Sequence, residues 1–109
     1  MLSLSEQVAE IEATLSVLAG RLLDASLLDA QPDIVRLDVK HLSDQPIHLV
    51  REMFSVLWQR QSWPRGALGY VEWNRLAQTA MQGGSTNLPG GIVARQATAG
   101  LLVLQKTDQ

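Results

Sequence analysis

The second half of the chain carries four arginines that are suited to contacts with a polyanion: Arg60, Arg65, Arg75 and Arg95. The planar guanidinium of arginine matches two phosphate oxygens at once, which a lysine ammonium does not. Three tryptophans, Trp58, Trp63 and Trp73, surround the segment 60–65. Interleaved arginines and aromatic rings bind RNA by phosphate contact and by stacking on bases. The four arginines are therefore the predicted RNA-binding residues, and core packing is the favoured interpretation for Trp58 and Trp73.

The charge along the chain is uneven, although the net charge is only −2. Residues 1–44 contain eight acids and three bases, whereas residues 45–107 contain two acids and six bases, so the two parts carry −5 and +4. All bases of the second part except Lys106 are arginine. This asymmetry indicates a polyanionic partner for the second part. Ordinary solvated surface charge is the alternative, and the sequence leaves it open.

Residue types that perform catalysis or hold metal ions form no recognisable pattern. His41 and His48 are the only histidines, and their spacing matches no zinc motif. The glycines of QGGST, residues 82–86, resemble those of a phosphate loop, but such a loop follows a strand, precedes a helix and usually carries a lysine. Here a helix is expected before the glycines and strands after them. We therefore interpret QGGST as a helix end, and we expect no catalytic residue, metal site or cofactor in this chain.

Length and composition indicate one folded domain. The chain has 109 residues, of which 46% are hydrophobic and 18% charged, as is typical of a globular protein. The absence of cysteine excludes disulfides and cysteine-based zinc sites, and it fits a reducing compartment. The start MLSLSEQVAE places acids before any apolar run long enough for a signal peptide. No stretch approaches the roughly 20 apolar residues of a membrane span. We expect a cytoplasmic protein without a membrane segment.

Three amphipathic helices are predicted, over about residues 5–25, 46–61 and 69–81. The first has apolar residues at alternating spacings of four and three: Leu4, Val8, Ile11, Leu15, Leu18 and Leu22. The second has the stripe Ile47, Val50, Phe54, Leu57 and Trp58, with Ser43 or Asp44 expected as its cap. The third has the stripe Trp73, Leu76, Ala77 and Ala80, and glycines 83 and 84 end it. The regular stripe of the first helix predicts a partner helix.

The remaining segments predict short β elements. Residues 34–39 alternate apolar and charged side chains and are expected to form a short edge strand. Two alternating strands within 91–106 predict a C-terminal β-hairpin with its turn at residues 97–100. Pro89-Gly90-Gly91 predicts a second bend. The predicted fold class is α+β, with about three helices packed on a small antiparallel sheet in a single domain.

Several segments form an ordered set along the chain. They are the long first helix, IVRLDV at 34–39, LVR ending at Arg51, the tryptophan-containing third helix, and LPGG followed four residues later by Arg95. In this order they resemble the region that follows the catalytic domain in bacterial tRNA(Ile)-lysidine synthetases. The resemblance covers nearly the whole chain, from about Ser5 to Lys106.

The resemblance implies a role in tRNA modification. The family is an ATP-dependent ligase that joins lysine to the wobble cytidine of tRNA(Ile), and its nucleotide site carries an S-G-G-x-D-S signature. The sequence contains no such signature, so ATP with Mg would belong to a separate catalytic domain. The resemblance therefore implies a non-catalytic accessory domain that binds and orients tRNA through the four predicted arginines. It also implies docking of the first helix on the catalytic domain, and in isolation that helix is expected to pair with a second copy.

A function of a different class remains open from the sequence alone. The acidic, amphipathic first helix is also typical of a small protein–protein interaction module. In that case the arginines would only be solvated surface residues. Binding of bulk tRNA at low salt separates the two hypotheses.

Overall fold

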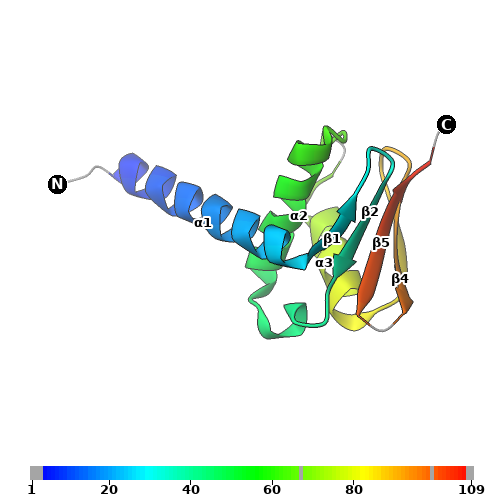
Figure 1. Cartoon of the computed structure of the whole chain (residues 1–109). Helices are drawn as coiled ribbons and strands as arrows, with labels where there is room; N and C mark the ends of the chain where they lie inside the picture. Colours follow the sequence, from blue (N-terminus) through cyan, green and yellow to red (C-terminus); the bar gives the residue numbers. More distant parts are fainter. Residues whose placement is uncertain (1–3, 67, 99, 108–109) are drawn as a thin grey trace.

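The computed structural model describes residues 4–66, 68–98 and 100–107, and the side chains of residues 14–66, 68–96 and 100–107. The elements run in the order α1 (Leu4–Ser26), β1 (Leu27–Ala30), β2 (Ile34–Asp38), the 3-10 helix η1 (Leu42–Asp44), α2 (Ile47–Gln61), α3 (Tyr70–Gln82), β3 (Ser85–Leu88), β4 (Ile92–Thr98) and β5 (Leu101–Lys106). Helices α2 and α3 lie on one side of the sheet, and α1 projects away from it (Figure 1). The predicted α+β class is confirmed.

The five strands form one antiparallel sheet in the order β1-β2-β5-β4-β3. The expected C-terminal hairpin is the β4–β5 pair, although β4 continues to Thr98, which pairs with Leu101. The turn is therefore shorter than the expected 97–100. Strand β2 is an interior strand rather than the predicted edge strand, because β1 pairs along its outer side. Strand β1 was not predicted, because it has only four residues and follows α1 directly, without a turn signal between them.

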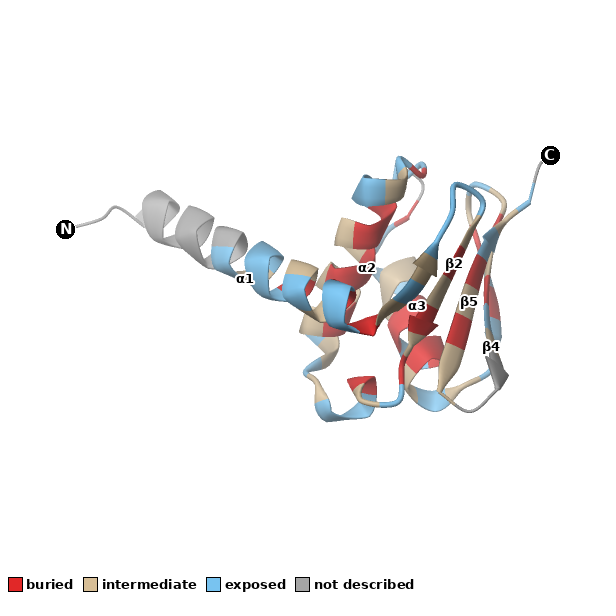
Figure 2. Ribbon diagram, in the orientation of Figure 1, coloured by how far each residue is buried: buried red, intermediate tan, exposed pale blue. Residues whose placement is uncertain are grey.

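The sheet has one face against the helices and one face toward solvent. Side chains directed at the helices are buried: Val35, Leu37, Thr86, Leu88, Ile92, Ala94, Leu102 and Leu104. The other face carries a row of directly paired residues across four strands: Arg36, Val103, Arg95 and Ser85. Figure 2 shows buried and less buried residues alternating along these strands. Such alternation is usual when only one face of an antiparallel sheet is covered.

The core is built around Trp58, in agreement with the interpretation made from its helical stripe. The Trp58 ring is fully buried and meets the rings of Trp63 and Trp73 edge to face, with centroids 5.0 Å and 5.3 Å away. Trp63 is also buried, and its Nε1 donates a hydrogen bond to the Pro32 carbonyl at 3.0 Å. Val50, Phe54 and the other predicted members of the α2 and α3 stripes are buried or packed against the core.

Helix α2 begins without the expected side-chain cap. Ser43 and Asp44 belong to η1 instead, where the Asp44 and Gln45 N–H groups bond to the carbonyls of His41 and Leu42. Pro46 occupies the N-cap position, and its carbonyl accepts from the N–H groups of the first turn. The expectation was wrong because burial of Leu42 closes this segment into its own turn before α2 starts.

Helix α1 packs with a face that is rotated from the predicted stripe. Ala19, Leu23 and Ser26 are fully buried, whereas Leu18 of the predicted stripe is 46% exposed. Leu15 and Leu22 lie at the border of the buried face, and the side chains of Leu4, Val8 and Ile11 lie outside the described ones. The neighbouring Val17 is 54% exposed. Val17 and Leu18 are therefore about half exposed on the surface of α1.

The β3–β4 turn depends on glycine at position 90. Gly90 has φ +89°, and a Cβ atom there would lie 2.9 Å from Cγ of Pro64 in the α2–α3 connection. Gly90→Ala is expected to lower the free energy of unfolding by about 1–3 kcal/mol, from the backbone conformation and the contact with a rigid ring. Urea unfolding followed by circular dichroism measures this. Gly66→Ala is the matched control, because its added Cβ would meet nothing within 4 Å; equal losses in both variants would contradict the explanation.

Candidate nucleic-acid interface

The helical layer is hollowed between α1, α2 and α3. The hollow is open, has a volume of about 270 Å³, and is lined by Leu15 of α1, by His48, Arg51, Glu52 and Ser55 of α2, and by Tyr70 and Trp73 of α3. The four α2 residues recur at spacings of three, one and three, which places them on one helix face. The buried apolar residues of α2 lie on the adjacent face of the helix. Because that face packs against the core, the face with these four residues is directed toward the hollow.

The rim of the hollow contains an ordered aromatic–arginine pair. Tyr70 is 67% exposed, and the Arg51 guanidinium carbon lies 4.8 Å from the centre of its ring. The Arg51 Nη1 also donates to Oδ1 of Asn74 at 3.2 Å. Tyr70 stands at the first position of α3, whose start is fixed by the Glu72 carboxylate accepting the Gly69 N–H at 2.9 Å. Two independent contacts thus hold Arg51 in place beside an exposed ring.

A second arginine reaches the same hollow. Arg65, in the connection between α2 and α3, is exposed, and its Nη1 lies 3.4 Å from Oγ of Ser55 in the lining. The acid of the lining, Glu52, accepts a hydrogen bond from Ser16 of α1 at 3.4 Å. The lining of the hollow therefore contains one arginine, one histidine, one carboxylate and two aromatic rings, and Arg65 contacts this lining through Ser55.

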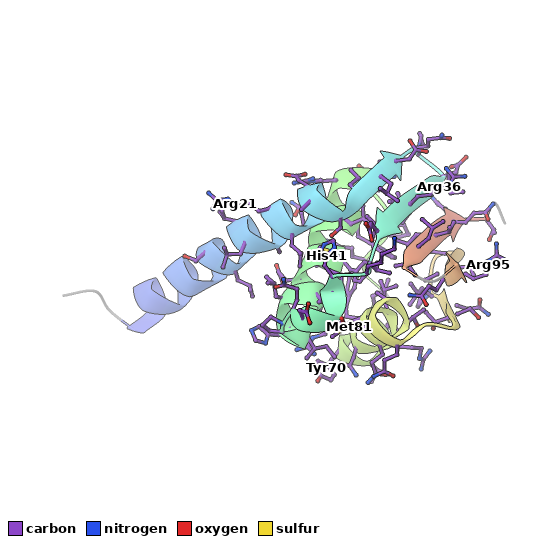
Figure 3. All side chains as sticks on the ribbon, turned by 60° about the horizontal axis from the view of Figure 1, so that its bottom comes forward. Arg21, Arg36, His41, Tyr70, Met81 and Arg95 are labelled. Carbon is purple, nitrogen blue, oxygen red and sulfur yellow. The ribbon has the colours of Figure 1, made fainter. Side chains whose placement is uncertain are left out.

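The four predicted RNA-binding arginines do not form one surface. Arg60 is paired with Asp24 of α1 at 2.6 Å, and this ion pair is partly exposed. Arg75 is exposed on α3. Arg95 is exposed on β4, on the sheet face without helices, beside a shallow hollow lined by Val93, Val103, Gln105 and Thr107. Figure 3 shows Arg95 on the sheet and Tyr70 in the helical layer, on different parts of the molecule. Of the four, Arg65 is the one at the hollow.

The sequence analysis did not assign Arg51 or Tyr70 to a site. Arg51 was expected only as part of the LVR segment, and no role was predicted for the single tyrosine. One feature of the sequence points to them: both lie outside the apolar stripes of their helices, and Tyr70 is a large ring at a helix start. Their proximity across two helices depends on how α2 packs against α3, which the sequence alone does not state.

A serine–histidine pair was also missed, and it is structural. Ser26 Oγ lies 3.1 Å from Nε2 of His41, which resembles a nucleophile beside a base. Ser26 is fully buried at the end of α1, so no substrate reaches its hydroxyl. The pair joins α1 to the connection between β2 and η1.

The described part of the chain contains no group of three or more histidine, aspartate or glutamate side chains placed to hold a metal ion. Within the same residues, no helix combines the length and apolar character that crossing a lipid bilayer requires. No family model, curated protein or solved structure matches this chain. A functional assignment therefore depends on the geometry of the molecule itself and on the ordered motifs of its sequence.

Proposed function

We propose that this chain is a tRNA-binding and orienting domain of a tRNA(Ile)-lysidine synthetase. The observation that carries the proposal is the hollow at which Arg51, Arg65 and the exposed Tyr70 meet. Arginine contacts phosphate oxygens with paired hydrogen bonds, and exposed rings stack on bases. These are the residue types by which proteins hold RNA, and here they lie together on ordered helices.

The motifs behind the resemblance occupy positions that shape the fold. IVRLDV supplies the interior strand β2 and LVR places Arg51 on α2. LPGG ends β3 and forms the turn into β4, where Gly90 and Gly91 both have positive φ. Of the segments that carry the resemblance, LVR thus reaches the hollow through Arg51, whereas IVRLDV and LPGG belong to the sheet.

The proposed role is to position the RNA rather than to modify it. Phosphate contacts fix the register and orientation of a nucleic acid without reading its bases. The ligase reaction, with ATP and Mg, would be performed in the cytoplasm by a catalytic domain that this chain complements. The chain by itself is not expected to form lysidine.

The test is titration of the whole chain with bulk tRNA at about 50 mM salt, followed by anisotropy of a fluorescent label on the RNA. We expect a complex that weakens as salt increases. Each phosphate contact adds about −0.7 to −0.9 to the slope of log K against log salt, so two arginine contacts predict a slope of about −1.4 to −1.8. Absence of a complex at the lowest salt would reject the proposed function.

A second candidate function is favoured by one observation on α1. Val17 and Leu18 are about half exposed on a helix that projects from the body of the protein (Figure 1). Exposed apolar side chains on a projecting helix are typical of a surface that contacts another protein. That partner would be the catalytic domain that the resemblance implies, or a second copy of this chain. Failure to bind tRNA in the titration above would leave this function as the preferred one.

A further inference from the structure

We propose that the hollow between α1, α2 and α3 holds one unpaired nucleotide, with its base stacked on the ring of Tyr70. The inference rests on the proposed function and adds two things to it: the form of RNA that is bound and the residue that holds the base. It is carried by the arrangement of Tyr70, Arg51 and Glu52 around one open hollow.

Tyr70 has the properties of a stacking platform. Two thirds of the residue is exposed, so the ring is accessible to a ligand, and tyrosine is a residue type that is enriched at binding surfaces. The Arg51 guanidinium, 4.8 Å from the ring centre, is itself fixed by Asn74, so the pair is ordered before a ligand arrives. Bases stack on aromatic rings and on guanidinium planes alike. Because the guanidinium lies over one face of the ring, a base stacks either on the opposite face of the Tyr70 ring or on the outer face of the guanidinium.

The shape of the site favours an unpaired base over a duplex. In an A-form helix the bases are stacked on one another, and their edges in the deep groove are not reached by side chains. A base can enter a hollow only when it is splayed out of the stack. At about 30 Å³ per water molecule, the 270 Å³ hollow has room for about nine water molecules. This volume is enough for one base, which would displace them.

The charges in the hollow orient the nucleotide. Arg51 lines the hollow and Arg65 contacts Ser55 of its lining, whereas Glu52 contributes a carboxylate to the lining. The carboxylate repels a phosphate, so the phosphate lies toward the arginines and the base lies toward Glu52. A carboxylate accepts hydrogen bonds from the amino group of cytosine, which uracil lacks. The site therefore favours a cytidine over a uridine.

The experiment uses the whole chain and fluorescein-labelled hexanucleotides of cytidine or uridine, with tRNA as a parallel probe. Tyr70→Ala is expected to raise the Kd for hexacytidylate by about 5- to 150-fold, the usual effect of removing a stacking ring. Tyr70→Phe keeps the ring and is expected to stay within about twofold of the unmodified chain. Val71→Ala alters the neighbouring exposed side chain and is the matched control, with no expected change. Glu52→Gln is expected to abolish the preference for cytidine.

The outcomes separate this inference from the proposed function. If tRNA binds but hexanucleotides do not, or if Tyr70→Ala leaves hexacytidylate affinity unchanged, the nucleotide site is rejected and the proposed function stands. If neither RNA binds, both are rejected. Equal affinity of the unmodified chain for the two hexanucleotides, or a cytidine preference that survives Glu52→Gln, overturns the assigned orientation of the base.

Discussion

Trp58→Ala is expected to lower the free energy of unfolding by about 3–5 kcal/mol, the usual cost of removing a large aromatic side chain from a core. Trp58 is fully buried and contacts both other tryptophan rings edge to face. Each such pair adds about 0.5–1.5 kcal/mol beyond the buried area. A domain of this size is stable by only about 5–15 kcal/mol, so the variant would lose a large share of its stability.

The loss at Trp58 is expected to come from packing rather than from hydrogen bonding. The Nε1 atom of Trp58 is buried and has no hydrogen-bond partner among the described residues. Trp58→Phe removes this unpaired donor and keeps most of the ring, so a loss of less than half that of alanine is expected. Urea unfolding followed by circular dichroism avoids the change in tryptophan fluorescence. Val71→Ala, at a residue 60% exposed, is the control and should change stability by less than about 0.5 kcal/mol. A similar small effect at Trp58 would contradict the assigned core.

The double substitution of Arg51→Gln and Arg65→Gln is expected to weaken tRNA binding by about tenfold or more at low salt. It removes the guanidinium that lines the hollow and the one that contacts Ser55 in its lining, while keeping side chains of similar length. The slope of log K against log salt should become shallower by about 1.4 to 1.8, the amount expected for the loss of two phosphate contacts. Titration with labelled tRNA over a series of salt concentrations measures both quantities.

The matched control is the double substitution of Arg75→Gln and Arg95→Gln. It changes the net charge by the same amount, but its residues lie on α3 and on the helix-free face of the sheet, whereas Arg51 lines the hollow and Arg65 contacts Ser55 in its lining. Only a small, non-specific loss of affinity is expected from it. If the control weakens binding as much as the hollow variant, the RNA contacts the chain through dispersed charge, and the hollow is not the interface.

The sequence alone predicted the elements that repeat a strong pattern. The second and third helices were expected at 46–61 and 69–81 and are found at Ile47–Gln61 and Tyr70–Gln82. Their apolar stripes are long enough for the helical period to be unambiguous. The alternation of 91–106 and the glycines near position 90 likewise predicted the hairpin and its preceding bend. Whether a segment forms a helix or a strand follows from the spacing of its apolar residues, and this spacing can be read from the segment's own sequence.

The elements that were missed or misplaced depend on distant partners. β1 has four residues and becomes a strand only by pairing with β2, which is also why β2 is interior rather than at an edge. On α1, Leu18 continues a regular stripe, yet Ala19 and Leu23 are buried instead because α2 packs against the adjacent face. The pattern of apolar residues along one segment does not predict which other helix or strand packs against that segment.

For the candidate site, the sequence by itself determined that arginines and aromatic residues are concentrated in the second half of the chain. Only the tertiary structure decided which of them meet: it paired Arg60 with Asp24, placed Arg95 on the sheet, and set Arg51 over the ring of Tyr70. The physical reason is that composition and spacing fix the chemistry of each side chain. The distances between side chains of different elements follow from how α1, α2 and α3 pack.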